Sequence, residues 1–345
     1  MKLATTKRAE IIRRFLLASI RTGNSEYFHD AMETFKLSRQ AVHSHLSKLV
    51  KMGYLAAIGN TRGRTYILGP VRSHTSILAL KGLRESDVYR HDFGFIFKDL
   101  PRDLENICHY GFTEILNNAI DHSEGNEVKI TVDRTGEKIK ITIADDGEGI
   151  FLHVARLLRL SDPRESLLEL SKGKLTTDPA NHTGQGIFFT SRAFDKFTIF
   201  SGDLVFSHED GQHNDWLLHD ETNNQGTYVA MEISLSSERT LKEVFDAFTG
   251  SEEEDFAFNK TVVPVKLVLY EGESLVSRSQ AKRILNRVEK FSTVILDFSD
   301  VHSIGQAFAD EIFRVFARAH PQITLVPLDT NDDVKRMIHT ATHHA

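Results

Sequence analysis

The sequence predicts an α+β multidomain protein, and three observations support this. The chain has 345 residues, enough for two or three hydrophobic cores. Its charge is unevenly distributed: residues 1–70 hold 12 Lys and Arg against 4 Asp and Glu, so this head carries +8 and the remainder, from a total of −6, carries −14. Helical and alternating apolar patterns also follow one another in blocks instead of regular βα units.

The basic head predicts three helices followed by a hairpin. Apolar residues recur at helical spacing over residues 6–21 and again over residues 27–35. A third helix is expected after Ser38, which suits an N-cap, and it should end near Gly53. Two short strands then enclose a basic tip at residues 59–64.

This order of elements resembles a winged helix-turn-helix domain over residues 1–70, which implies binding to double-stranded DNA. A small protein-docking domain with a basic surface is the alternative interpretation. The side chains of the third helix and the hairpin that suit phosphates and base edges are Ser38, Arg39, Gln40, His43, Lys48, Arg62 and Arg64.

Residues 71–99 have a mixed pattern that predicts a helical connector, and residues 100–236 predict a two-layer α+β domain. Within the latter, a helix precedes two alternating strands that meet at Thr135-Gly136. A loop-rich stretch at about residues 152–183 should follow, then a helix from Gly186 and further strands.

Four motifs of this middle domain carry chemistry. The stretch "FTEILNNAIDHSEG" places Glu114 and Asn118 one helical turn apart on a polar face. "DDGEGI" puts the Asp145 carboxylate at a strand end beside two glycines, and "HTGQGIFF" opens a helix whose free N–H groups suit a phosphate. "GTYV" adds Thr227 on a later strand.

This succession resembles the Bergerat-fold ATP-binding superfamily, which includes gyrase B, histidine kinases and anti-sigma-factor serine kinases. The resemblance implies an α/β sandwich that binds ATP and Mg²⁺. It makes Asn118 a magnesium ligand, Asp145 the acceptor for the adenine amino group and Glu114 a catalytic general base. The nucleotide-binding positions that it implies are Asn118, Asp121, His122, Asp145, Gly147, Gly149, Ile150, Thr183, Gly184, Gln185, Gly186, Ile187 and Thr227.

The resemblance also makes the loop-rich stretch an ATP lid, with Lys172 and Lys174 as candidate contacts of the γ-phosphate. Glu114 favours hydrolysis, although it would also suit a helix cap or a solvated face. His91 precedes Asn118 by only 27 residues, too few for the helical hairpin that carries the acceptor of a histidine kinase. A protein serine or histidine kinase acting on a separate partner, and a non-hydrolysing nucleotide-sensing transcription factor, remain the alternatives.

Residues 256–340 alternate strand and helix and resemble a small α/β STAS-like domain, with "VILDF" as its buried central strand. Gln306 stands where a phosphorylated Ser of that fold would begin a helix, and Ser303 is a poor substitute. We therefore expect this domain to dock an unknown protein partner, or its own neighbouring domain, without a phosphorylation switch.

Other features of the sequence bear on the compartment of the protein and on metal binding. Cys108 is the only cysteine and no apolar run approaches about 18 residues, so a cytoplasmic protein without a membrane span is expected. His213, Asp215 and His219 form a spacing that chance supplies in a chain with 17 histidines. Together the patterns predict an ATP-dependent DNA-binding regulator in which nucleotide occupancy switches DNA or partner binding. A homodimer is one arrangement that fits this prediction.

Overall fold

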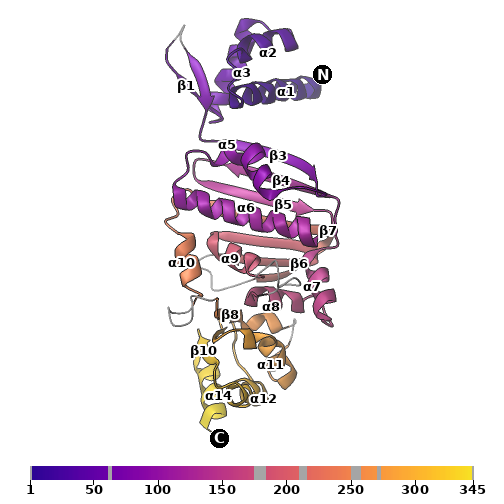
Figure 1. Cartoon of the computed structure of the whole chain (residues 1–345), viewed down its shortest axis with the longest axis vertical. Helices are drawn as coiled ribbons and strands as arrows, with labels where there is room; N and C mark the ends of the chain where they lie inside the picture. Colours follow the sequence, from indigo (N-terminus) through magenta and orange to yellow (C-terminus); the bar gives the residue numbers. More distant parts are fainter. Residues whose placement is uncertain are drawn as a thin grey trace.

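A computed structural model describes residues 2–60, 64–174, 184–209, 216–249, 258–269 and 273–343. Three bodies follow one another along its long axis (Figure 1): N-terminal helices, a central sheet with its helices, and a C-terminal α/β body. The predicted α+β multidomain class is confirmed. Among the described residues, no helix is both long and apolar enough to cross a bilayer.

The N-terminal body is built around the third helix. Ser38 caps this helix, because its Oγ accepts a hydrogen bond of 3.2 Å from the Ala41 N–H. Val42, Leu46 and Leu49 recur at helical spacing and are buried against the other two helices. The elements are α1 (Lys2–Arg21), α2 (Tyr27–Phe35), α3 (Arg39–Lys51) and the antiparallel strands β1 (Leu55–Ile58) and β2 (Thr65–Leu68).

The prediction of a helical connector over residues 71–99 is wrong for its first third. Residues 72–79 form strand β3 (Arg72–Ala79), which pairs with β4 along its whole length and whose residues alternate in burial. This pairing, which is remote in sequence, decides the conformation of a stretch whose own pattern is ambiguous. Helical structure follows as α4 (Glu85–Val88), a π-helical turn (Tyr89–Phe93) and α5 (Gly94–Phe97).

Two arginines fix this connector to the sheet. The Arg72 guanidinium is buried and donates hydrogen bonds to the carbonyls of Gly69, Phe95 and Lys98. Arg134 on the neighbouring strand also donates to the Lys98 carbonyl, at 2.8 Å. The chain that leaves the N-terminal body is therefore tied to the edge of the central sheet.

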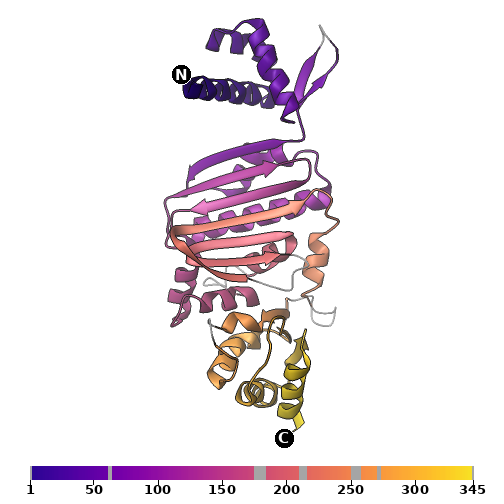
Figure 2. The same ribbon diagram turned by 180° about the vertical axis from the view of Figure 1, so that it is seen from behind.

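The central body is a five-stranded sheet in the order β3-β4-β5-β7-β6, with every pair of neighbours antiparallel. Helices cover one face of this sheet and the other face is open (Figure 2). Aromatic rings such as Phe112 of α6 fill the core between the layers, and each fully buried ring contributes about 1.5–3 kcal/mol. The elements are α6 (Arg102–His122), β4 (Glu127–Arg134), β5 (Lys138–Asp145), α9 (Gly186–Ala193), β6 (Lys196–Glu209), β7 (Trp216–Ser234) and α10 (Leu241–Asp246).

The stretch at residues 152–183 is not the loop that the sequence predicted, as far as it is described. Helix α7 (Ile150–Leu158) begins directly after the glycine-rich turn, and α8 (Glu165–Lys172) follows it. Phe151 and Val154 of α7 are buried against the sheet, as is Leu167 of α8. These tertiary contacts stabilise two helices of nine and eight residues that would be marginal alone.

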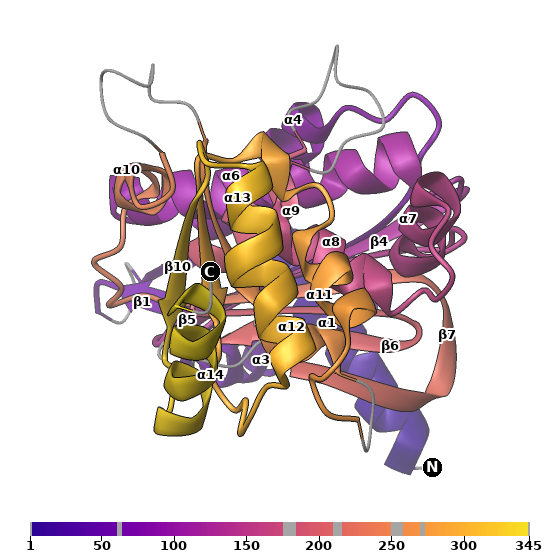
Figure 3. The ribbon, with the colours of Figure 1, turned by 90° about the horizontal axis from the view of Figure 1, so that it is seen from below.

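The C-terminal body contains a three-stranded parallel sheet in the order β10-β9-β8. The central strand β9 includes Val294 and Leu296, both fully buried, so the predicted central strand is confirmed. Figure 3 shows this body from its far end, with α11, α12 and α14 around the sheet. The elements are β8 (Lys260–Pro264), a 3-10 helix (Val265–Val268), α11 (Arg278–Leu285), a 3-10 turn (Val288–Lys290), β9 (Thr293–Asp297), α12 (Gln306–Asp310), a π-helical segment (Glu311–Phe316), α13 (Ala317–Ala319), β10 (Thr324–Leu328) and α14 (Asp332–His343).

Candidate functional site

A pocket of about 280 Å³ lies between α6, the end of β5, the start of α7 and the start of α9. Its wall combines apolar side chains with a few convergent polar groups, which is typical of a small-molecule site. From the residues that the sequence singled out, the pocket brings together Glu114, Asn118, His122, Asp145, Gly149, Ile150, Gly184, Gly186, Ile187 and Thr227.

Helix α6 contributes three polar side chains to the wall. Glu114, Asn118 and His122 are spaced four residues apart, so they lie on one face of this helix. The Nδ2 atom of Asn118 is buried and has no hydrogen-bond partner among the described residues. Because buried amides are nearly always paired, this atom indicates that the pocket is built for a polar ligand.

Asp145 ends strand β5 and forms the polar floor of the pocket. Its Oδ1 accepts hydrogen bonds from the backbone N–H groups of Gly147, at 3.0 Å, and Thr227, at 3.2 Å. Burial raises the pKa of this carboxyl, and the two backbone hydrogen bonds oppose the rise. Both of these hydrogen bonds end on Oδ1, and neither uses Oδ2.

The glycine-rich turn after Asp145 leaves no room for side chains. Gly149 has a φ of +94°, and a Cβ there would lie 2.5 Å from the Ser201 Oγ. A Cβ on Gly147 would lie 2.0 Å from the carbonyl oxygen of Ser123 at the end of α6. The turn therefore packs directly between the end of α6 and the sheet, and its backbone forms part of the pocket.

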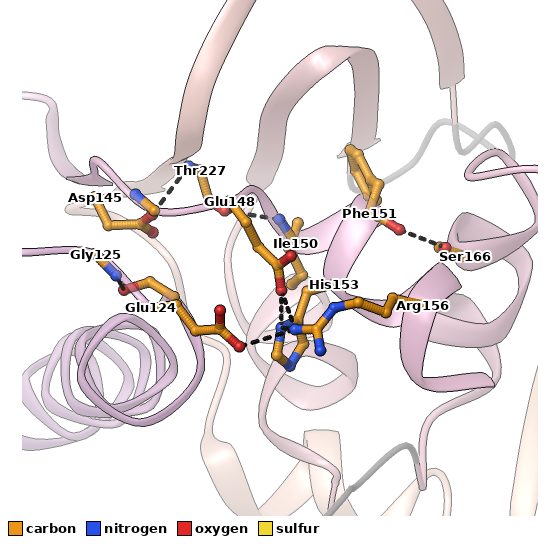
Figure 4. Close-up of polar contacts among 12 residues, drawn as sticks. Glu124, Gly125, Asp145, Glu148, Ile150, Phe151, His153, Arg156, Ser166 and Thr227 are labelled. Atoms are coloured by element: carbon orange, nitrogen blue, oxygen red, sulfur yellow. Dashed lines mark hydrogen bonds and ion pairs between the residues drawn. The ribbon is translucent and has the colours of Figure 1, made fainter. Parts of the chain in front are cut away.

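Thr227 joins this turn to strand β7. Its backbone N–H donates to Asp145, while its Oγ1 accepts a hydrogen bond of 3.0 Å from the Ile150 N–H. Figure 4 shows both hydrogen bonds. The hydroxyl thus holds the first residue of α7 against the sheet and lines the pocket beside Asp145.

The opposite end of the pocket is formed by the start of α9. Gly184 and Gly186 line the pocket, and Gln185 is the N-cap residue of this helix. The first N–H groups of a helix have no partner within the helix, and the helix dipole makes this end positive. The combination suits the phosphates of a nucleotide.

Several predicted residues lie elsewhere. Asp121 is exposed on α6, and neither Asp121, Gly147 nor Gln185 lines the pocket. Gly147 instead supports its floor through Asp145. Thr183 and Arg62 lie outside the described residues, as do His213 and Asp215.

The two lysines predicted to contact a γ-phosphate are engaged with the C-terminal body, so that prediction is wrong. Lys172 is fully buried, forms a 2.8 Å ion pair with Glu169 and donates to the Asn286 carbonyl. Lys174 donates at 2.7 Å to the Lys290 carbonyl. The carbonyls of the C-terminal body that accept from them are more than a hundred residues away in sequence, and no local pattern signals them.

The sequence prediction missed a charged cluster at the pocket mouth (Figure 4). Arg156 of α7 donates to Glu124, at 2.8 Å, and to Glu148, at 2.6 Å. Glu148 also contacts Nδ1 of His153, a residue that lines the pocket. The sequence pattern predicts a loop here, whereas helix α7, which begins at Ile150, places His153 and Arg156 on one face.

The predicted DNA-contacting side chains form a separate surface on the N-terminal body. Val42, Leu46 and Leu49 turn one face of α3 inward, which leaves the opposite face to solvent. The exposed positions at the start and along this face are Ser38, Arg39, Gln40, His43 and Lys48, and Arg64 at the start of the hairpin's second half is exposed as well.

Comparison with known families agrees with this geometry. Residues 104–236 match the histidine kinase-, DNA gyrase B-, and HSP90-like ATPase family, and residues 280–335 match the STAS-like domain of unknown function (DUF4325). A search of curated proteins finds no match for the chain. The central body is thus a nucleotide-binding region of the ATPase and kinase type, and the C-terminal body is STAS-like.

Proposed function

We propose that this chain is a DNA-binding regulator that binds Mg-ATP, hydrolyses it slowly and changes its DNA or partner binding with nucleotide occupancy. The observation that supports ATP binding best is the convergence of Asp145, Asn118 and Glu114 on one pocket from α6 and β5. The match of residues 104–236 to an ATPase family supports the same reading.

The pocket residues fit adenine at one end. The Asp145 carboxylate would accept from the exocyclic amino group of adenine, and guanine presents an acceptor oxygen at that position. Thr227 lies beside Asp145 and its hydroxyl can contact the same edge of the base. Selection of ATP over GTP follows from this pairing, because a carboxylate facing a carbonyl oxygen repels it.

The other end of the pocket fits Mg²⁺ and phosphates. Asn118 is half-buried there, its amide nitrogen is buried and unsatisfied among the described residues, and its oxygen is a hard ligand atom of the kind that Mg²⁺ prefers. The ion would neutralise phosphate charge when bound. The N–H groups at the start of α9 would hold the same phosphates.

Glu114 is the residue that we assign to hydrolysis. Its carboxylate would take a proton from a water whose oxygen attacks the γ-phosphorus. The bond from that phosphorus to the bridging oxygen breaks, which releases ADP and inorganic phosphate. A pure nucleotide sensor has no need of a general base, so the presence of Glu114 favours turnover of the nucleotide over sensing alone.

DNA binding is proposed for helix α3 and the hairpin. The exposed side chains of Arg39, Gln40 and Lys48 can reach phosphates and base edges, and the head carries a net charge of +8 over residues 1–70. Arg72 ties the chain between this body and the sheet, which gives nucleotide-dependent changes a route to the DNA surface. ATP shifts DNA affinity only by its different affinity for two arrangements of the chain.

Calorimetric titration of the full chain tests this function. We expect Mg-ATP to bind, Mg-GTP to bind at least about tenfold more weakly, and DNA affinity to change when a non-hydrolysable ATP analogue is present. DNA affinity that is identical with and without the analogue contradicts the switch. Transfer of the γ-phosphate to a separate protein would instead identify a kinase.

A further inference from the structure

Helix α8 is buried on all sides. Each residue from Ser166 to Lys172 is at most 8% exposed, although the segment includes Glu169 and Lys172. A short helix with no solvated face must lie between two packed bodies. Figure 1 shows where it lies: between the helices of the central body and the C-terminal body.

One side of α8 belongs to the nucleotide pocket. Leu170 lines the pocket itself, and Leu167 packs into the core of the central body. The Ser166 hydroxyl donates a 2.8 Å hydrogen bond to the Phe151 carbonyl of α7 (Figure 4). The position of α8 therefore sets the position of one pocket wall.

The other side of α8 is held by the C-terminal body. Leu168 packs into the core of that body. The Lys172 ammonium donates to the carbonyls of Arg283, at 3.1 Å, and Asn286, at 2.8 Å. The Asn286 amide in turn donates to Glu169 at 3.2 Å, so the ion pair between Glu169 and Lys172 is completed by groups from the other body.

The chain beyond α8 continues this attachment. The Thr261 hydroxyl of β8 donates a 2.7 Å hydrogen bond to the Lys172 carbonyl, and Arg287 donates to the Lys174 carbonyl at 3.0 Å. A Cβ on Gly173 would lie 2.9 Å from the ring of Phe258, so the end of α8 is in close contact with the C-terminal body. The C-terminal body therefore contacts the backbone at the end of α8 as well as the side chains of this helix.

The buried ion pair between Glu169 and Lys172 depends on the contacts with the C-terminal body. Burial lowers the pKa of Lys172, and the nearby Glu169 carboxylate opposes that effect. A buried ammonium requires its hydrogen-bond acceptors, and two of the three acceptors come from the C-terminal body. Moving the bodies apart would leave the ion pair without the carbonyl acceptors and the amide donor of the C-terminal body, or admit water to it.

We infer that the C-terminal STAS-like body is a positioning element of the nucleotide site, and that its docking on α8 and nucleotide binding are reciprocally coupled. This inference rests on the proposed nucleotide-binding function. Docking favours the arrangement in which Leu170 completes the pocket wall. By linkage, bound nucleotide must stabilise the docked arrangement to the same degree, and a partner that displaces the C-terminal body must weaken nucleotide binding.

The test uses a double variant of the full chain, Asn286→Ala with Arg287→Ala, which removes two contacts of Glu169 and touches no pocket residue. The matched control is Lys282→Ala on α11, because this lysine is 69% exposed and its ion pair, at 3.9 Å, is with Glu311 of its own body. Titration with Mg-ATP should show at least about fivefold weaker binding by the double variant and no change in the control. Equal affinities of the double variant and wild type overturn the inference.

Hydrogen exchange over α8 gives a second readout. We expect the amides of α8 to exchange more slowly in wild type with Mg-ATP than without it, and this protection should shrink in the double variant. If the double variant does not fold, Arg283→Ala replaces it, since this removes the 3.7 Å pair between α11 and Glu165 at the start of α8. A wild type that binds no nucleotide would contradict the proposed function; a wild type that binds, with no change in any variant, would contradict only the coupling.

Discussion

Glu114 Oε2 lies so close to the Gly186 backbone that a Cβ on residue 186 would be 2.1 Å from it. Real Cβ contacts essentially never fall below 3.0 Å, so the carboxylate occupies space that only glycine leaves open. The carboxylate assigned to water activation is thereby set against the first residue of α9, where the phosphates are proposed to bind. The proposed general base and the proposed phosphate site therefore meet where Glu114 contacts Gly186.

The first prediction replaces this glycine. Gly186→Ala should displace the Glu114 carboxylate while leaving the backbone unstrained, because Gly186 does not have a positive φ. We expect the hydrolysis rate to fall by about 10²–10⁴, the range associated with losing a positioned general base. Phosphate release under saturating Mg-ATP measures the change.

The matched control is Gly136→Ala in the turn between β4 and β5. A Cβ there would have no heavy atom within 4 Å, so hydrolysis should stay at the wild-type rate. If Gly186→Ala hydrolyses ATP as fast as wild type while folding normally, Glu114 is not the base.

The second prediction concerns Asp145 and pH. Burial raises the pKa of its carboxyl above the ordinary 3.8, and a protonated carboxyl is a poorer acceptor for the adenine amino group. Nucleotide affinity should therefore fall as the pH drops towards this raised pKa. Dissociation constants measured from about pH 8 down to pH 5 give the profile. Asp145→Asn should bind ATP at least tenfold more weakly and lose this pH dependence; a variant with an unchanged profile contradicts the assignment.

The same residue predicts a cost in stability. A raised pKa in the folded state stabilises the protein only where the carboxyl is protonated, and this contribution is lost as the pH rises through the folded pKa. At neutral pH the charged, buried carboxylate therefore opposes folding. Asp145→Asn without nucleotide should be at least as stable as wild type in urea unfolding at neutral pH. Marked destabilisation would mean that Asp145 is mainly a structural residue.

Motif order was enough to predict the pocket, because each motif carries its own local geometry. Glu114 and Asn118 share a helix face by spacing alone, and Asp145 sits where a strand gives way to glycines. The same logic placed Val42 and Leu46 inward on α3. These features depend on neighbours within one or two turns, which a sequence displays directly.

Other features depend on contacts that are distant in the sequence. Strand β3 forms because β4 pairs with it. Ile77 on β3 is apolar but 63% exposed, so the strand's sequence does not show a clear alternation of apolar buried and polar exposed residues. The sequence predicts a phosphate contact for Lys172, because the two carbonyls of the C-terminal body that accept from it lie 111 and 114 residues away. His153 was missed because its helix is stabilised by the sheet beneath it.

The third prediction concerns the connection between the N-terminal and central bodies. Arg72→Ala would remove the buried guanidinium that bonds the part-buried carbonyls of Phe95 and Lys98, so we expect a loss of about 2–4 kcal/mol in the free energy of unfolding. Chemical denaturation measures the loss. Arg84→Ala is the control, because the Arg84 side chain is 77% exposed and its 3.6 Å ion pair with Asp87 lies at the surface. This substitution should change the free energy of unfolding by less than about 0.5 kcal/mol. Equal effects of the two substitutions would contradict the role of Arg72.

The fourth prediction concerns DNA. Arg39→Ala on the exposed face of α3 should weaken DNA binding by about 1–3 kcal/mol, with a shallower salt dependence if the contact is to a phosphate. Arg14→Ala on α1 removes an equal charge, but Arg14 pairs with Glu10 at 2.7 Å, so a smaller effect is expected. Titrations of labelled duplex at several salt concentrations compare the two. A protein-docking role for this body would show as no measurable affinity for DNA in the wild type.

The central claim is that this pocket binds Mg-ATP and that Glu114 activates water there. Its most direct test is phosphate release by wild type and by Glu114→Gln, with Mg-ATP binding measured in parallel. We predict that both proteins bind with similar affinity and that only wild type releases phosphate. Binding by both with release by neither would contradict hydrolysis and leave a nucleotide sensor or a kinase, and equal release by both would contradict the role of Glu114.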